Sequence, residues 1–152
     1  MRVSELASDR VVNAGARMTL RAAAKVMRDE HVGDIVVTEE CGGRRRPIGI
    51  VTDRDIVIGV TALGLDASAL TMADVMNTQL YTAEMSADAD AVIGEMRKLG
   101  IRRAPVVDRE GFLKGIFTLD DYMEHLAKRL LMVYGLIKSE RSHEQQARLA
   151  LT

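Results

Sequence analysis

An internal repeat constrains this chain more than any other feature of its sequence. The heptapeptide Gly-Ile-Val-Thr-Asp-Arg-Asp at residues 49–55 returns 66 positions later as Gly-Ile-Phe-Thr-Leu-Asp-Asp at residues 115–121. An apolar stripe with helical spacing precedes each copy, at residues 20–27 and 89–96, with an offset of 69 positions. The difference places about three extra residues between the stripe and the motif of the first copy. A repeat of this length predicts two similar structural units.

Both units follow the same predicted order of elements. A helical turn opens each unit, an extended segment and the striped helix follow, and two apolar strands joined by a polar hairpin lead into a second helix at the motif. The strands are apolar throughout, which indicates sheets covered on both faces. They are expected at residues 35–37 and 48–51 in the first unit, and at residues 104–107 and 113–117 in the second.

The composition narrows the class of protein. A net charge of −1 over 152 residues lacks the positive surface of a general nucleic-acid binder, and 3% aromatic residues offer little base stacking. No apolar run approaches the roughly 20 residues that span a bilayer. Cys41 is the only cysteine, which excludes an internal disulfide and is compatible with a reducing compartment. We therefore expect a cytoplasmic protein that binds neither membrane nor nucleic acid.

The sequence shows no catalytic or metal-binding cluster. His31, His125 and His143 are scattered and have no Cys, His or acidic partner at ligand spacing. Cys41 lies in a polar loop, and no serine or cysteine stands in a nucleophile motif. We therefore expect a protein that is not an enzyme, holds no metal and requires no cofactor.

The duplicated strand-strand-helix unit with its Gly-h-h-Thr-x-x-Asp motif, where h is apolar, resembles the cystathionine β-synthase (CBS) domain family. Residues 49–55 resemble the first copy in small stand-alone CBS-pair proteins, and residues 100–108 resemble the approach to the second. The resemblance covers about residues 1–130 and implies an α/β (α+β) fold. In such a fold two β-α-β-β-α repeats pack as an intramolecular pseudo-twofold pair, called a Bateman module. The expected domains are repeat 1 at residues 1–66, repeat 2 at residues 67–130, and a C-terminal helical extension with a polar tail at residues 131–152.

The resemblance also implies a function. CBS pairs are usually regulatory sensors that bind AMP, ADP, ATP or S-adenosylmethionine in clefts between the repeats, often as homodimers, and this chain would then act on an unidentified effector protein. An Asp carboxylate can accept both ribose hydroxyls, while Thr at a helix start and Arg side chains suit a phosphate. The expected ribose and phosphate contacts are Thr52, Arg54, Asp55, Thr118, Asp121, Arg102 and Arg103. The expected adenine walls are Asp34, Ile35, Val36, Tyr81, Ala104 and Pro105.

Alternatives to this interpretation stay open at the level of sequence. Thr-x-x-Asp at a helix start is close to a capping box, so Asp55 and Asp121 could be structural, although such boxes favour Glu or Gln at the last position. The first repeat has Asp34 where the second has Arg103, and a carboxylate would oppose a phosphate in the first cleft. The module could also be a ligand-free scaffold for dimerisation.

The second closing helix extends beyond the repeat. From Asp121 it can continue through Leu126, Leu130, Val133 and Ile137, which have roughly heptad spacing. This stripe either packs on its own domain or forms a seam with a partner helix.

Overall fold

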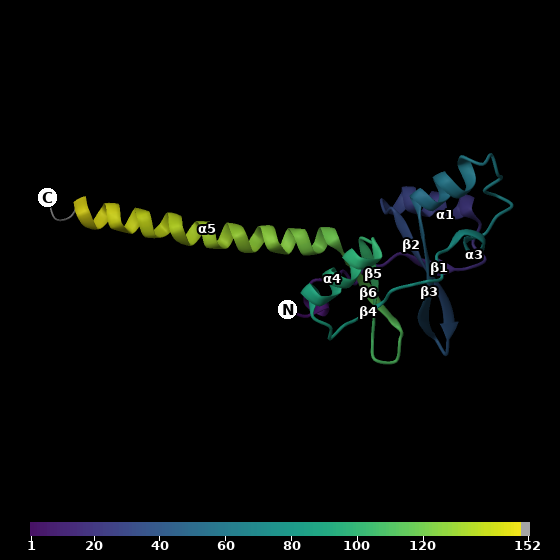
Figure 1. Cartoon of the computed structure of the whole chain (residues 1–152), viewed down its shortest axis with the longest axis horizontal. Helices are drawn as coiled ribbons and strands as arrows, with labels where there is room; N and C mark the ends of the chain where they lie inside the picture. Colours follow the sequence, from purple (N-terminus) through teal and green to yellow (C-terminus); the bar gives the residue numbers. More distant parts are fainter. Residues whose placement is uncertain (150–152) are drawn as a thin grey trace.

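Two three-stranded sheets form the body of the molecule, and a long helix projects from it (Figure 1). The structure is a computed structural model that describes residues 1–149. In each sheet the first strand pairs in parallel with the middle strand, which pairs antiparallel with the last. The first sheet contains β1 (Asn13–Gly15), β2 (Asp34–Cys41) and β3 (Arg44–Thr52), and the second contains β4 (Ala83–Glu84), β5 (Arg103–Val107) and β6 (Leu113–Thr118). The α/β class and the internal duplication are therefore confirmed.

The two striped helices form where the apolar spacing predicts them. They are α1 (Leu20–Glu30) and α4 (Ala89–Leu99). The Thr19 hydroxyl caps α1 by accepting a hydrogen bond from the Ala22 amide at 3.2 Å, and the Asp88 carboxylate caps α4 from the Ala91 amide at 3.1 Å. Each helix buries its stripe against the sheet of its own unit, so each unit has its own core.

The helices that begin at the repeated motif differ in length. In the first unit α2 (Asp53–Ile56) runs into a π-helical segment at Val57–Thr61. In the second unit α5 (Leu119–Leu149) continues for 31 residues. The short opening elements are a 3₁₀ turn at Val3–Glu5 and α3 (Met72–Val75).

The opening segments are exchanged between the two cores. Val3 is buried in the core of the second unit, and its amide donates to the Ala87 carbonyl at 2.9 Å. Met72 is buried in the core of the first unit, and its amide donates to the Met18 carbonyl at 2.9 Å. The expected domain limits of 1–66 and 67–130 follow the sequence period, whereas the packing crosses them in both directions.

The glycine that begins each motif allows this exchange. The segment leading into β1 crosses β6, where Ser8 pairs with Ile116, and a Cβ on Gly115 would clash with the Ser8 carbonyl. The segment leading into β4 crosses β3 in the same way. There a Cβ on Gly49 would lie 3.1 Å from the Asn77 carbonyl oxygen. Each linker thus lies directly on the last strand of the other unit because that strand has glycine at the crossing.

The two hairpins also contact each other. Arg44, at the tip between β2 and β3, forms an ion pair with Glu110 of the second hairpin. Its guanidinium lies 3.7 Å from the centroid of the Phe112 ring, within the range of a cation–π contact. The longer first hairpin therefore reaches across to the second unit.

Helix α5 projects from the body of the molecule (Figure 1). Tyr122 packs against the second core and donates its hydroxyl to Asp90, but Leu126, Leu130, Val133 and Ile137 are exposed. Packing of this stripe on its own domain, one of the two expectations, is therefore wrong. The polar segment after Ser139 continues the helix to Leu149, and residues 150–152 of the expected tail lie outside the described residues. No helix within residues 1–149 has the length and apolar character needed to cross a bilayer.

The close crossing at Gly115 predicts a contrast between two glycine substitutions. Gly115→Ala should lower the free energy of unfolding by about 1–3 kcal/mol, because the new methyl group is forced against backbone atoms. Gly94→Ala should raise it by up to about 1 kcal/mol, because Gly94 lies within α4 and its Cβ would meet no neighbouring atom within 4 Å. Urea denaturation of both variants measures the difference. Equal effects would contradict the crossing.

Candidate functional site

Two cavities lie between the units. Each combines the motif of one unit with the linker and the helix-strand turn of the other. The first cavity, of about 360 Å³, contains the first motif and is lined by Ile50, Thr52, Asp53, Arg54, Asp55, Asn77, Gln79, Leu80, Tyr81, Gly100, Ile101, Arg102 and Arg103. The second, of about 240 Å³, contains the second motif and is lined by Arg10, Val12, Val32, Gly33, Asp34, Arg102, Arg103, Ile116, Thr118 and Asp120.

Both motifs form complete capping boxes. The Thr52 hydroxyl accepts from the Asp55 amide at 3.1 Å, while Oδ2 of Asp55 accepts from the Thr52 amide and hydroxyl, each at 2.8 Å. Thr118 and Asp121 repeat these bonds, with Oδ2 of Asp121 again accepting both. Among residues 1–149, Oδ1 of each aspartate has no hydrogen-bond partner. The caps therefore use only one oxygen of each carboxylate.

A third capping box shows that the local geometry alone does not define a ligand site. Thr71 and Asp74 at the start of α3 form the same bonds, with Oδ2 of Asp74 accepting from the Thr71 amide at 2.7 Å. Neither residue lines the two cavities between the units, although Asp74 lines a separate cavity together with Arg54 and Asp55. The position of Asp55 and of Thr118 at a cavity between the units, rather than the capping box, distinguishes the two repeated motifs.

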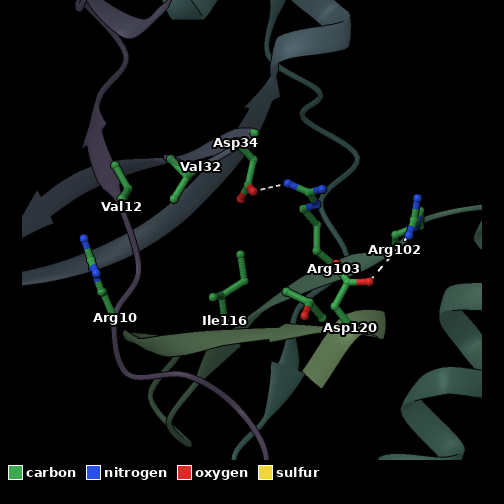
Figure 2. Close-up of a pocket in the computed structure, with 10 residues that line it drawn as sticks. Arg10, Val12, Val32, Asp34, Arg102, Arg103, Ile116 and Asp120 are labelled. Atoms are coloured by element: carbon green, nitrogen blue, oxygen red, sulfur yellow. Dashed lines mark hydrogen bonds and ion pairs between the residues drawn. The ribbon is translucent and has the colours of Figure 1, made fainter. Parts of the chain in front are cut away.

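An ion pair between Asp34 and Arg103 lies at the second cavity (Figure 2), and Arg103 also lines the first. The side chains are 13% and 31% exposed, so much of each charge is removed from water. Burial raises the pKa of Asp34, an effect that outweighs the attraction of Arg103 and is reinforced by the nearby Asp53 carboxylate. Arg103 is thus held in place by a carboxylate that pays a desolvation cost, which is typical of a functional site.

The other cations of the second cavity are also paired. Arg102 lies 3.6 Å from Asp120, as Figure 2 shows, and Arg10 lies 3.0 Å from Glu30. In the first cavity Arg54 is exposed and has no ion pair among the described residues. The first cavity therefore holds the more available guanidinium group.

The structure places the expected site residues unevenly. Thr52, Arg54, Asp55 and Tyr81 line the first cavity, Asp34 and Thr118 line the second, and Arg102 and Arg103 line both. Asp121 does not line a cavity itself but is hydrogen-bonded to Thr118. Ile35, Val36, Ala104 and Pro105 line neither cavity, because their side chains are fully buried within the units.

The exchange of segments changes the expected position of the carboxylate. The sequence comparison placed Asp34 at the first cleft, but the structure places it in the second cavity, because the turn before β2 faces the motif of the other unit. The linkers supply lining residues that motif analysis missed, among them Arg10, Val12, Asn77 and Gln79. Arg10 and Gln79 occupy matching positions, 69 residues apart, and this match is the signal that could have found them.

The chain belongs to the CBS domain family. The family model matches it twice, at residues 3–60 and 72–128. Hypoxic response protein 1 of Mycobacterium tuberculosis is 33% identical over 124 residues, which cover 82% of this chain and 84% of that protein. An uncharacterised protein of Methanopyrus kandleri is also 33% identical, and the match covers 80% of this chain and 61% of that relative.

Solved structures show the same architecture. A CBS domain protein of Pyrobaculum aerophilum complexed with AMP superposes with a TM-score of 0.72 at 27% identity, over 80% of this chain and 89% of that one. The CBS domain pair of protein MJ0100, in complex with 5′-methylthioadenosine and S-adenosyl-L-methionine, superposes with a TM-score of 0.73 at 25% identity, over 85% and 98% of the two chains. The tandem CBS pair expected from the repeat is confirmed.

The ion pair between Asp34 and Arg103 predicts that replacing two adjacent arginines lowers the free energy of unfolding by different amounts. Arg103→Met should lower the free energy of unfolding by about 1–3 kcal/mol at pH 7, because Asp34 loses a charged hydrogen-bond donor while partly buried. Arg102→Met should cost less than about 1 kcal/mol, because its pair with Asp120 is exposed. Chemical denaturation of both variants measures these losses.

The ion pair between Asp34 and Arg103 also determines how the stability deficit of Arg103→Met changes with pH. A raised pKa means that the folded state binds the proton of Asp34 more tightly than the unfolded state, so this group's contribution to stability falls as pH rises above the ordinary aspartate value of 3.8. Removing Arg103 raises the pKa of Asp34 further, because the attraction of the guanidinium lowers that pKa. The stability deficit of Arg103→Met should therefore shrink as pH is lowered towards that value. A deficit that stays constant between pH 7 and pH 4 would contradict this account.

Proposed function

We propose that this chain is a regulatory module that binds an adenosine ligand in one or both cavities between its CBS repeats. The observation that carries the proposal is that the two cavities pair a Thr-x-x-Asp motif, with one carboxylate oxygen unused, with arginines from across the module. The AMP complex and the S-adenosyl-L-methionine complex among its structural neighbours support this class of ligand.

The proposed contacts follow from the geometry of the motif. Oδ1 of Asp55 or Asp121 would accept the two ribose hydroxyls while Oδ2 keeps its cap. The adenine would lie against linker side chains, with Leu80 and Tyr81 in the first cavity and Val12 and Val32 in the second. The fully buried strand residues first expected as walls would contribute backbone groups only.

The charges favour different ligands in the two cavities. Arg54 gives the first cavity a guanidinium without an ion pair, so we propose that a phosphorylated adenosine binds there. Each cavity is lined by two aspartates, but in the second cavity both of them, Asp34 and Asp120, are paired with its arginines. An adenosine ligand without phosphate, such as the sulfonium S-adenosylmethionine, suits that cavity better. This reverses the preference inferred when Asp34 was assigned to the first cleft.

We further propose that the module is a cytoplasmic homodimer without catalytic activity that transmits ligand binding to an effector protein. Val57 and Ile58 are exposed on the helical segment that closes the first unit, and apolar helix surface of this kind is commonly covered by a twofold-related copy. A phosphate bound to Arg103 would compete with Asp34 for the guanidinium. That competition offers a physical route from ligand binding to a change between the units.

Ligand binding should stabilise the fold. Binding to the native state alone contributes about 2.7 kcal/mol at a ligand concentration of 100 times Kd, which raises Tm by several degrees in a domain of this size. A thermal-shift panel of AMP, ADP, ATP and S-adenosylmethionine at millimolar concentration measures the effect. No shift with any of the four would favour the ligand-free scaffold.

Glutamate substitutions should separate ribose binding from helix capping. Asp55→Glu and Asp121→Glu keep an acid that can cap the helix, so the free energy of unfolding should change by less than about 1 kcal/mol. The added methylene displaces the carboxylate by about one bond length and should weaken ligand binding at least about tenfold, since a hydrogen bond to a charged group contributes about 1.5–3 kcal/mol. Calorimetric titration gives the affinities.

The third capping box supplies the matched control. Asp74 lines neither cavity between the units, although it shares a separate cavity with Asp55. Asp74→Glu should therefore resemble Asp121→Glu in its effect on stability, while ligand affinity at the second cavity stays at the parental value. If Asp55→Glu and Asp121→Glu both bind as tightly as the parent, the two aspartates act only as caps and the assignment of the site is wrong.

A further inference from the structure

Helix α5 presents apolar side chains that the described part of the chain does not cover. The helix projects away from the two units (Figure 1), and its described side chains are exposed from Leu126 onward. Leu130 and Leu131 are 71% and 68% exposed, and the apolar residues at positions 132–134 and 136–137 are exposed as well. A helical segment with apolar residues on most of its faces is typically buried in protein.

One stripe on this helix has the spacing of a coiled-coil seam. Met123, Leu126, Leu130, Val133 and Ile137 follow one another at alternating steps of three and four residues, the a/d pattern of a heptad. These five residues are called the seam below. Leu131 and Met132 lie outside it. The same steps continue to Glu140 and Glu144, where the apolar character ends.

The charges of the helix determine which way a second helix can run. In a parallel pair each seam position meets its own copy, so Glu140 and Glu144 would face like charges. In an antiparallel pair an a position meets a d position, which places Leu130 against Val133 and Leu126 against Ile137 of the other helix, and Glu140 against Met123. Glu140 and Glu144 then no longer face the same residues of the second helix.

The net charges of the two halves of α5 also favour the antiparallel direction. Residues 119–129 carry three carboxylates and two cations, whereas residues 138–149 carry three cations and two carboxylates. Only an antiparallel arrangement places the acidic half of one helix beside the basic half of the other. It also places the opposite ends of the two helix dipoles together.

We propose that α5 pairs antiparallel with α5 of a second copy of this chain, centred between Leu130 and Val133. This contact is separate from the dimer proposed through the outer faces of the units, and it does not depend on ligand binding. A lipid surface is the other occupant that an exposed apolar helix could have. The experiment below tests it.

Disulfide cross-linking tests both the pairing and its direction. In a Cys41→Ser background, the double variant Leu126→Cys/Ile137→Cys should give a covalent dimer on mild oxidation. Within one helix these positions are about 16 Å apart, too far for an internal disulfide. Each single variant alone should remain monomeric on a denaturing gel, and a mixture of the two single variants should give the covalent dimer.

Two adjacent leucines provide the control. Leu130→Gln in the double-cysteine background should lower the yield of covalent dimer at least about fivefold, whereas Leu131→Gln should leave it unchanged. Both residues are similarly exposed within one chain, so a difference between the two variants reports on the second helix. Equal effects of the two substitutions would overturn the seam.

The other outcomes are equally decisive. Covalent dimers formed by each single-cysteine variant alone would show a parallel pair and overturn the proposed direction. Failure of the double variant to cross-link would overturn the pairing. If the parent then also cosedimented with vesicles of phosphatidylcholine and phosphatidylglycerol, the helix would be assigned to a lipid surface.

Discussion

The crossing of each linker over the last strand of the other unit is the constraint on which the rest of the structure depends. Gly115 and Gly49 allow the linker backbones to lie directly on β6 and β3. The crossing carries Val3 into the second core and Met72 into the first. Neither core is therefore complete without residues from the other half of the chain, and the two cavities are composite for the same reason.

The ion pair between Asp34 and Arg103 lies at the second cavity, and Arg103 also lines the first. Its carboxylate has a raised pKa because burial outweighs the attraction of the guanidinium. A buried ion pair is weak evidence for stability, since its desolvation cost offsets much of its Coulomb energy. The proposed role in ligand recognition would account for the pair, because Arg103 lines both cavities.

Most of the fold could be predicted from the sequence because the chain contains two copies of the same unit. The matching stripes and motifs identified the two units, their order of elements and the helix caps at Thr19 and Asp88. The sequence did not predict the exchange of segments, because the spacing of apolar residues within a linker does not indicate which of the two cores it enters. Asp34 was assigned to the first cleft for that reason.

The candidate site was predictable where a motif marks it and not elsewhere. Thr52 and Asp55 follow from the repeat, and they lie at a cavity. Ile35 and Ala104 were expected as walls because an apolar strand does not show which of its side chains face a cleft, and both are buried. Arg10 and Asn77 lie in linkers without a motif, so only the assembled structure brings them to the cavities. The role of these residues in ligand binding stays a prediction.

A crystal structure of the protein soaked with AMP and, separately, with S-adenosylmethionine tests the central claim most directly, because it shows where a ligand lies. The account predicts adenosine density between the units, with the ribose hydroxyls on Oδ1 of Asp55 or Asp121 and the Thr hydrogen bonds to Oδ2 intact. Empty cavities at millimolar concentrations of both ligands, or density only outside them, would contradict it.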